Sequence, residues 1–258
     1  GENLARPAEL QLREVLFGLM TDAGVELREL GLSVNESIAL TGRALFFRFL
    51  IGRGIVNDNH LSLITRNADH LTGCFGNEKS IAETNYWLDK TFNGDLLHLP
   101  TDNYYEYFHH LYEKHGAAVA RPLSAILGLD DPLGPGASQG RLHLGWGDLD
   151  FDHIPVGLLS ETYEELMRQF DEVGRHETSV YYTPSHIAEY MVAEALHLNP
   201  QGSRAKVLDP ACGAGVFLTA TFRRLAELQF EENGVRPDRS ALRKILNTQL
   251  VGFDINGH

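Results

Sequence analysis

The stretch Lys206-Val-Leu-Asp-Pro-Ala-Cys-Gly-Ala-Gly-Val-Phe-Leu218 decides the fold of the second half of the chain. Val207 and Leu208 are expected to end a short buried strand, which Asp209 and the proline after it stop. The small residues from Cys212 to Gly215 predict a loop, and the residues after them have the apolar spacing of a helix. A strand, a glycine loop and a helix N-terminus together present free backbone N–H groups, and Asp209 adds an acceptor. The sequence therefore predicts a pocket for a nucleotide-like cofactor.

The composition favours a globular protein of one or two domains. The chain has 258 residues, of which 43% are hydrophobic, and no apolar run reaches the length of about 20 residues that a membrane helix needs. Two cysteines and no leader-like segment fit a reducing, cytoplasmic location. The net charge of −13 does not favour contact with nucleic acid through these residues. The chain begins with Gly1 and ends just after an expected strand, so we expect a piece of a longer protein.

The first 172 residues predict a helical domain. Apolar residues recur with near-helical spacing over residues 8–30, and Ser33-Val-Asn-Glu36 matches a capping box that opens a largely apolar, central helix. A second box, Ser80-Ile-Ala-Glu83, is expected to start another helix. The Gly- and Pro-rich stretch near residues 128–145 predicts an exposed loop.

Aromatic and histidine residues crowd residues 102–117. The five rings there indicate a helix that packs into a core, and an aromatic stacking face for bases is the weaker alternative because no Lys or Arg is interleaved. His109, His110 and His115 match no metal motif and are interpreted as surface residues. The alternating acids that start at Asp148 fail the calcium-loop rule, which requires Gly at its sixth place and Glu at its twelfth.

Two further segments flank the glycine loop. Thr183 is expected to cap a helix whose first residue is Pro184, and this helix is expected to bury a face formed by three apolar residues, Ile187, Met191 and Ala195. Gln249 to Ile255 predicts a second strand that ends in Asp254, at the place where an acid would hold ribose hydroxyls.

Two other nucleotide folds are excluded. The run that starts at Gly213 reads G-x-G-x-x-L, with Leu218 where a dinucleotide fold has Gly or Ala, and Asp254 lies far beyond the expected spacing of about 20 residues. A phosphate loop needs Gly-Lys-Ser or Gly-Lys-Thr, which does not follow.

The three segments together resemble the amino-methylating DNA methyltransferases. T-P-x-x-I-A-x-x-M-V from Thr183, D-P-A-C-G-x-G-x-F-L from Asp209 and G-F-D-I-N from Gly252 are similar to their first three ordered motifs. Upstream, less specific segments at residues 41–54, 92–97 and 154–165 resemble the type I modification subunits and the large fused restriction–modification proteins.

This resemblance implies a helical N-terminal domain, residues 1–172, followed by an incomplete Rossmann-like, S-adenosylmethionine-dependent methyltransferase domain, residues 173–258. It implies that Thr183 and Pro184 contact the methionine end of the cofactor, that Asp209 orients the methionine amino group, and that Asp254 holds the ribose. The remaining implied cofactor residues are those of the glycine loop and two apolar walls: Ala211, Cys212, Gly213, Gly215, Phe217 and Ile255.

One motif of the family is missing. Its members carry N/D-P-P-Y/F/W, whose ring stacks on the extruded base, and no Asn-Pro-Pro or Asp-Pro-Pro occurs here. We therefore expect no catalytic residue within the chain, and an inactive fragment of a site-specific adenine-N6 methyltransferase from a restriction–modification or phage-defence system. The expected partners are double-stranded DNA, through segments mostly outside this chain, and specificity or restriction subunits, with no membrane.

Two alternatives stay open. Related methyltransferases share the same motifs and act on RNA or protein, so the methyl acceptor is not fixed by these residues. The helical half, which carries no recognisable chemistry over residues 1–150 and has an acidic balance, is also compatible with an interaction or regulatory module.

Overall fold

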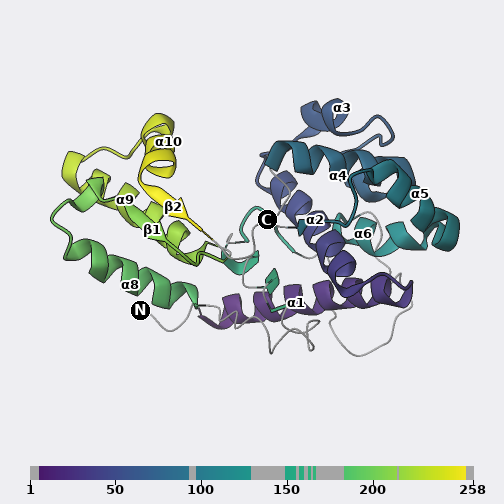
Figure 1. Ribbon diagram of the computed structural model, residues 1–258, viewed down its shortest axis with the longest axis horizontal. Coiled ribbons are helices and arrows are strands. Elements are labelled where there is room, and N and C mark those ends of the chain that lie inside the picture. The colour runs from purple at the N-terminus through teal and green to yellow at the C-terminus, as the bar shows by residue number, and fades with distance from the viewer. Residues whose placement is uncertain are drawn as a thin grey trace. The chain divides into compact units, whose positions relative to one another are not determined.

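A computed structural model describes residues 6–92, 97–128, 149–154, 157–159, 162–163, 165–166, 183–213 and 215–253 (Figure 1). The chain divides into two compact units, unit 1 (Gly1–Glu177) and unit 2 (Thr178–Gly257). The predicted boundary between residues 172 and 173, and most of the predicted loop near 128–145, lie outside the described residues. Among the described residues, helices are the only regular elements of unit 1, and the strands belong to unit 2.

Unit 1 is an assembly of helices and short 3-10 turns. Its α-helices are α1 (Arg6–Glu29), α2 (Val34–Gly52), α3 (Leu61–Ile64), α4 (Glu78–Phe92), α5 (Tyr104–His115) and α6 (Ala120–Ile126). Single 3-10 turns lie at Asp58–His60, Leu71–Phe75 and Gly116–Val119. No helix in the described part of the chain is long and apolar enough to cross a bilayer.

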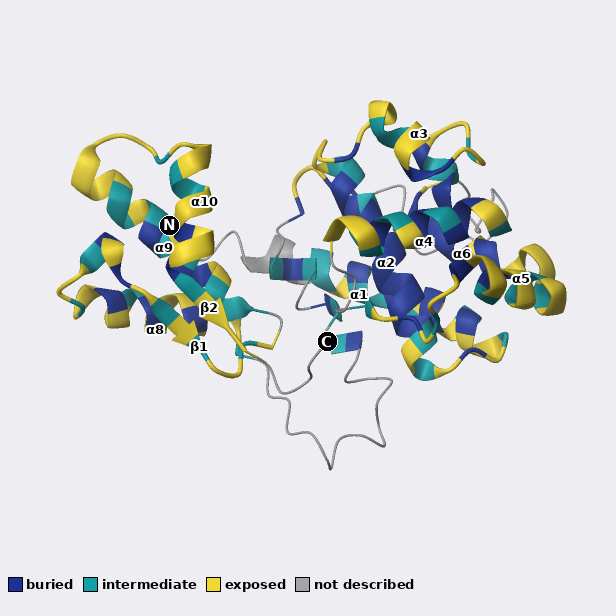
Figure 2. Ribbon diagram, turned by 45° about the horizontal axis from the view of Figure 1, so that its top comes forward, coloured by how far each residue is buried: buried dark blue, intermediate teal, exposed yellow. Residues whose placement is uncertain are grey.

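The predicted capping box at the start of α2 is confirmed. The Ser33 hydroxyl accepts a hydrogen bond from the Glu36 backbone N–H at 3.2 Å, and the Glu36 carboxylate accepts one from the Ser33 N–H at 2.8 Å. The helix that follows is buried over most of its length and packs against α1 and α6 (Figure 2). Because an all-round apolar helix must be enclosed, α2 is the centre of unit 1.

The start of α4 differs from the prediction. The helix begins at Glu78, and Asn77 caps it: its side chain accepts from the Ser80 N–H at 3.0 Å, while the Ser80 hydroxyl accepts from the Asn77 N–H at 3.2 Å. Ser80 is therefore the reciprocal partner in the cap, and the predicted role of Glu83 is wrong. Its carboxylate instead accepts hydrogen bonds from Thr65, Arg66 and Asn67.

The aromatic segment forms α5, whose rings enter the core. Tyr104 and Phe108 are buried, whereas Tyr105 on the opposite side is 54% exposed. His109 and His110 lie at the surface beside glutamates. Within the described residues, no group of three or more His, Cys, Asp or Glu side chains is placed to hold a metal ion. The core interpretation of this segment is confirmed for Tyr104 and Phe108, with Tyr107 and Tyr112 partly buried, and it is wrong for Tyr105.

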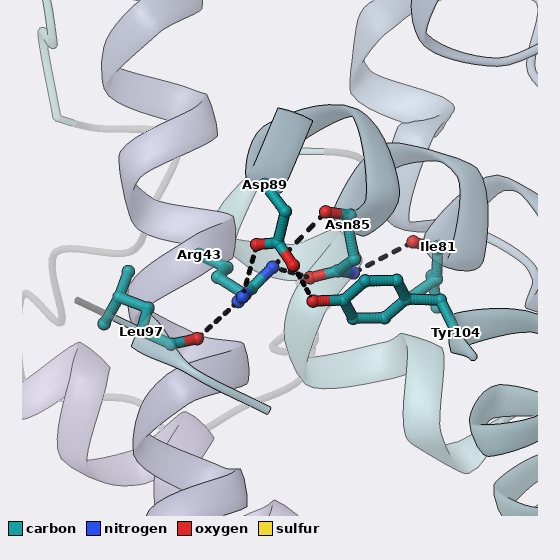
Figure 3. Close-up of polar contacts among 6 residues, drawn as sticks. All are labelled: Arg43, Ile81, Asn85, Asp89, Leu97 and Tyr104. Atoms are coloured by element: carbon teal, nitrogen blue, oxygen red, sulfur yellow. Dashed lines mark hydrogen bonds and ion pairs between the residues drawn. The ribbon is translucent and has the colours of Figure 1, made fainter. Parts of the chain in front are cut away.

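A buried ion pair joins α2 to α4 and α5 (Figure 3). The Arg43 side chain is 3% exposed, and its Nη2 lies 2.6 Å from Oδ1 of Asp89, which is 29% exposed. Arg43 also donates to the backbone carbonyl of Leu97 at 2.6 Å and to Asn85. Tyr104 donates its hydroxyl to Asp89, and burial, together with that hydrogen bond, raises the pKa of Tyr104 to about 12. The Tyr104 hydroxyl therefore stays protonated, and available as a donor to Asp89, near neutral pH.

Unit 2 contains both predicted strands, paired in parallel, but the second is shorter than predicted, since it ends at Gly252 rather than at Asp254. Strand β1 (Val207–Asp209) pairs with β2 (Leu250–Gly252), and Asp209 lies opposite Gly252. Three helices, α8 (Ser185–His197), α9 (Val216–Asn233) and α10 (Arg239–Thr248), share a core with Val207 and Leu250. Parallel strands joined through helices are the elementary unit of α/β folds.

Two predicted burial patterns in unit 2 are wrong. Leu208 was expected in a buried strand, yet it is 58% exposed, and its partner Val251 is 49% exposed. The buried face of α8 is formed by Ala188, Val192 and Leu196, one position beyond the predicted face. In Figure 2, α8 has dark buried segments between exposed ones, whereas β1 and β2 are teal and yellow.

Candidate cofactor site

The candidate site lies where β1 and β2 end side by side. The Phe253 N–H donates to the Asp209 carbonyl at 2.9 Å, and the Phe253 carbonyl accepts from the Cys212 N–H at 2.8 Å. These two hydrogen bonds continue the pairing of the sheet beyond its last strand residues. They fix the turn after β1 against the segment that leaves β2.

Two glycines shape the loop between β1 and α9. Gly213 has φ of 50° and Gly215 has φ of 81°, both in the left-handed region that other residues rarely adopt. Gly215 is the N-cap of α9, and its N–H donates to the Cys212 carbonyl at 2.8 Å. An added Cβ at either glycine would meet nothing within 4 Å. The predicted helix start at Val216 is confirmed, and the loop leaves open space at the positive end of an 18-residue helix.

The two carboxylate oxygens of Asp209 differ, because one accepts a hydrogen bond and the other has no partner among the described residues. Its Oδ1 accepts a hydrogen bond from the Ala211 N–H at 3.2 Å. Its Oδ2 is buried and has no hydrogen-bond partner among the described residues. A buried carboxylate oxygen without a donor is costly, and such an atom in a native protein calls for an explanation such as a bound ligand.

Thr183 and Pro184 lie directly before α8, but not in the predicted capping arrangement. Pro184 is the N-cap, its φ of −54° and ψ of 139° are not helical, and no side chain caps the helix. The Pro184 carbonyl instead accepts from the N–H groups of Ile187 and Ala188. Thr183 is half-buried and does not cap α8. The predicted contact of Thr183 and Pro184 with the cofactor stays a prediction.

The remaining predicted cofactor residues divide into two groups. Phe217, in the first turn of α9, is half-buried and packs against the core of unit 2. Asp254 and Ile255 lie outside the described residues, which end at Phe253. The pairing of Asp209 with Gly252 nevertheless directs the chain after β2 toward the same edge of the sheet as the glycine loop.

The two cysteines differ in environment, which gives a prediction. Cys74 is 0% exposed, and burial raises the pKa of its thiol to about 12, whereas Cys212 is half-buried in the glycine loop. At pH 8 only about one Cys74 in ten thousand is a thiolate, which is the reactive form. We expect a disulfide reagent to label Cys212 in the native protein and Cys74 only after denaturation, as read by peptide mass mapping. Labelling of Cys74 in the native protein would contradict its burial.

One residue near the site was not singled out in the sequence. Gly252 lies in β2, and an added Cβ there would be 2.6 Å from Cδ1 of Leu218 and 3.0 Å from Sγ of Cys212. The glycine in the run Val251-Gly-Phe253 is the signal that could have revealed it, because a glycine inside a strand marks a close approach.

Comparisons with known protein families give one match. Residues 156–256 match the family model of N-6 DNA methylases. Comparisons with curated proteins and with solved structures gave no match. The matched range contains α8, β1, the glycine loop, α9, α10 and β2 of unit 2, together with residues 156–177 of unit 1. Residues 156–256 therefore form a DNA N6-adenine methyltransferase-like region.

Proposed function

We propose that unit 2 binds S-adenosylmethionine and that the intact protein, of which this chain is a piece without the catalytic motif, methylates adenine N6 in DNA. The observation that carries the proposal is Oδ2 of Asp209, which is buried and has no partner among the described residues, at the carboxyl end of β1 beside the glycine loop. The family match over residues 156–256 supports a methyltransferase in general. The identity of the cofactor as S-adenosylmethionine and of the acceptor as adenine N6 are the additional parts of this proposal.

The residues of the site fit the methionine end of this cofactor. Oδ2 of Asp209 accepts a hydrogen bond from its ammonium group, while Oδ1 stays with the Ala211 N–H. The loop from Cys212 to Gly215 passes beneath it with no side chain at Gly213 or Gly215 in the way. The N-terminus of α9 favours its carboxylate. When bound, the cofactor supplies a methyl group on a positively charged sulfur.

Other residues complete the proposed site. Thr183 and Pro184 contact the methionine end from the start of α8, Phe217 and Ile255 provide apolar walls, and Asp254 holds the ribose hydroxyls. In this proposal β1 and β2 belong to a Rossmann-like sheet, in which ligands bind beyond the carboxyl ends of the strands.

The acceptor is proposed to be double-stranded DNA in a restriction–modification or phage-defence system. The net charge of −13 means that phosphate contacts come mainly from segments outside this chain. An adenine must leave the base stack before its amino group can reach a cofactor in such a pocket. Specificity or restriction subunits are the proposed protein partners.

A methyl-transfer assay tests the proposal. The protein, expressed from its complete reading frame, is incubated with tritiated S-adenosylmethionine and unmethylated DNA, RNA or protein in parallel. Label in N6-methyladenine of DNA is the expected result. Label in RNA or protein alone, or none in DNA while the cofactor is bound, would contradict DNA adenine methylation.

A further inference from the structure

Gly252 is the point at which β1, the glycine loop and α9 meet. It is the last residue of β2 and lies opposite Asp209. A Cβ added there would lie 2.6 Å from Cδ1 of Leu218 in the first turn of α9. It would also lie 3.0 Å from Sγ and 3.2 Å from Cβ of Cys212 in the loop. Atoms in favourable contact are about 3.5–4.0 Å apart, so a side chain at this position must displace a neighbour.

Position 252 requires glycine because there is no space for a side chain. Gly252 is not among the glycines with positive φ, unlike Gly213 and Gly215. Those two glycines have open space where a Cβ would lie, whereas Gly252 has two side chains against it. The site therefore uses glycine for two different reasons, backbone conformation in the loop at Gly213 and Gly215 and space in β2 at Gly252.

The two neighbours of Gly252 differ in how far they can yield. Cδ1 of Leu218 ends a flexible, half-buried side chain, which can turn aside with some loss of packing. Cys212 is held by its backbone, because its N–H donates to the Phe253 carbonyl at 2.8 Å. Its Cβ follows the backbone, so a side chain at position 252 pushes the loop itself. The same push strains the hydrogen bond that holds the loop to the chain after β2.

We propose that Gly252 is a positioning residue for the cofactor site. Its missing side chain lets Cys212 and Leu218 lie directly on β2, and this seats the glycine loop beside Asp209. Gly252 acts through the loop and does not touch the cofactor. The inference rests on the proposed function, because it concerns the same pocket.

Binding and stability measured together test this role. We expect Gly252→Ala to raise the Kd for S-adenosylhomocysteine about tenfold and Gly252→Val about a hundredfold, as overpacking typically does. Adding Leu218→Ala to Gly252→Ala removes the shortest contact, 2.6 Å, so that the new methyl group can shift toward α9 and away from Cys212. We expect this double variant to recover affinity toward the wild type, while its Tm falls further because leucine packing is lost.

Relative to Gly252→Ala, the double variant is expected to bind more tightly and to have a lower Tm. These opposite changes distinguish a positioning role from a general contribution to stability. If Gly252 only stabilises the fold, the double variant binds more weakly than Gly252→Ala, and the inference is overturned. Unchanged affinity in Gly252→Ala also overturns it. If Gly252→Ala is only partly folded, the folded fraction from its unfolding curve corrects the apparent Kd, and a corrected Kd equal to the wild-type value overturns the role.

Two controls complete the design, which uses calorimetry and thermal unfolding of the protein from its complete reading frame. Gly18→Ala, in α1, meets nothing within 4 Å, so affinity should be unchanged and Tm equal or higher. Wild-type protein that does not bind S-adenosylhomocysteine would overturn the proposed function itself. If the wild type binds S-adenosylhomocysteine and the Gly252 variants bind it equally tightly, only this inference is overturned.

Discussion

Replacement of Asp89 by alanine is expected to destabilise unit 1 by about 3 kcal/mol, because it leaves the buried charge of Arg43 without its carboxylate. Loss of one partner of a buried ion pair costs about 3–5 kcal/mol. The lower end applies because the Asp89 side chain is 29% exposed, so water can approach the vacated place. The Tyr104 hydroxyl loses its acceptor in the same variant.

Tryptophan fluorescence during denaturant unfolding measures this effect. Both tryptophans of the chain, Trp87 and Trp146, belong to unit 1, and Trp87 lies two residues before Asp89 on α4. The Trp87 ring packs edge-on against Phe47 of α2, so its emission reports the contact between the two helices. A change of less than about 1 kcal/mol in Asp89→Ala would contradict a buried-charge role.

Two further variants test whether the loss of stability comes from the buried charge of Arg43 or from the loss of any ion pair. Asp89→Asn keeps an oxygen acceptor for Arg43 or Tyr104, so it should destabilise unit 1 less than alanine does. Glu26→Ala breaks a pair of similar length within unit 1, 2.9 Å to Arg121, whose side chains are 35% and 65% exposed. An exposed pair contributes only about 0–1 kcal/mol, so this variant should be close to the wild type. Equal losses in Asp89→Ala and Glu26→Ala would argue against the explanation.

The features that the sequence predicted well are those fixed by local chemistry. Ser33 and Glu36 cap α2 because both partners lie within one turn. The start of α9 at Val216 follows from Gly213 and Gly215, which the tight loop requires. The parallel pairing of β1 and β2 follows from the helices between them.

The errors arise where two local patterns compete. Asn77 and Ser80 are both good capping residues three positions apart, and the upstream one caps α4. In α8, two adjacent stripes are apolar, one containing Ile187 and Met191 and the other Ala188 and Val192. Periodicity alone does not distinguish such stripes, and packing against α9 selects the second.

A glycine within a strand could mark Gly252 as a place of close approach, but the sequence does not identify the residues it approaches, because they are distant in the chain. Leu218 and Cys212 precede it by more than 30 residues, and only the parallel pairing of the strands brings them together. The unpartnered oxygen of Asp209 is likewise a property of the folded site, although the acid itself was predicted. Local sequence therefore located the pocket, and tertiary contacts supply its geometry.

Asp209→Asn is expected to weaken binding of S-adenosylmethionine by about 1.5–3 kcal/mol, or roughly 10- to 150-fold in Kd. Asparagine keeps the size of the side chain and an oxygen for the Ala211 N–H. In place of Oδ2 it can present an N–H group, which is itself a donor and cannot accept a hydrogen bond from the cofactor ammonium group. Calorimetry at fixed pH and salt measures the loss. Unchanged affinity would show that Asp209 does not hold the ammonium group.

The stability of Asp209→Asn, unlike its affinity, should not fall, because Oδ2 of Asp209 is buried without a partner in the described part of the chain. Replacing an unpaired carboxylate with a neutral amide removes a desolvation cost, so the cofactor-free variant should have an equal or higher Tm. Asp238→Asn is the matched control, since Asp238 caps α10 through a 2.8 Å hydrogen bond from Ala241, and asparagine caps equally well. That control should change neither affinity nor Tm. Lower affinity with undiminished stability in Asp209→Asn alone would mean that this carboxylate is retained for binding at the expense of the fold.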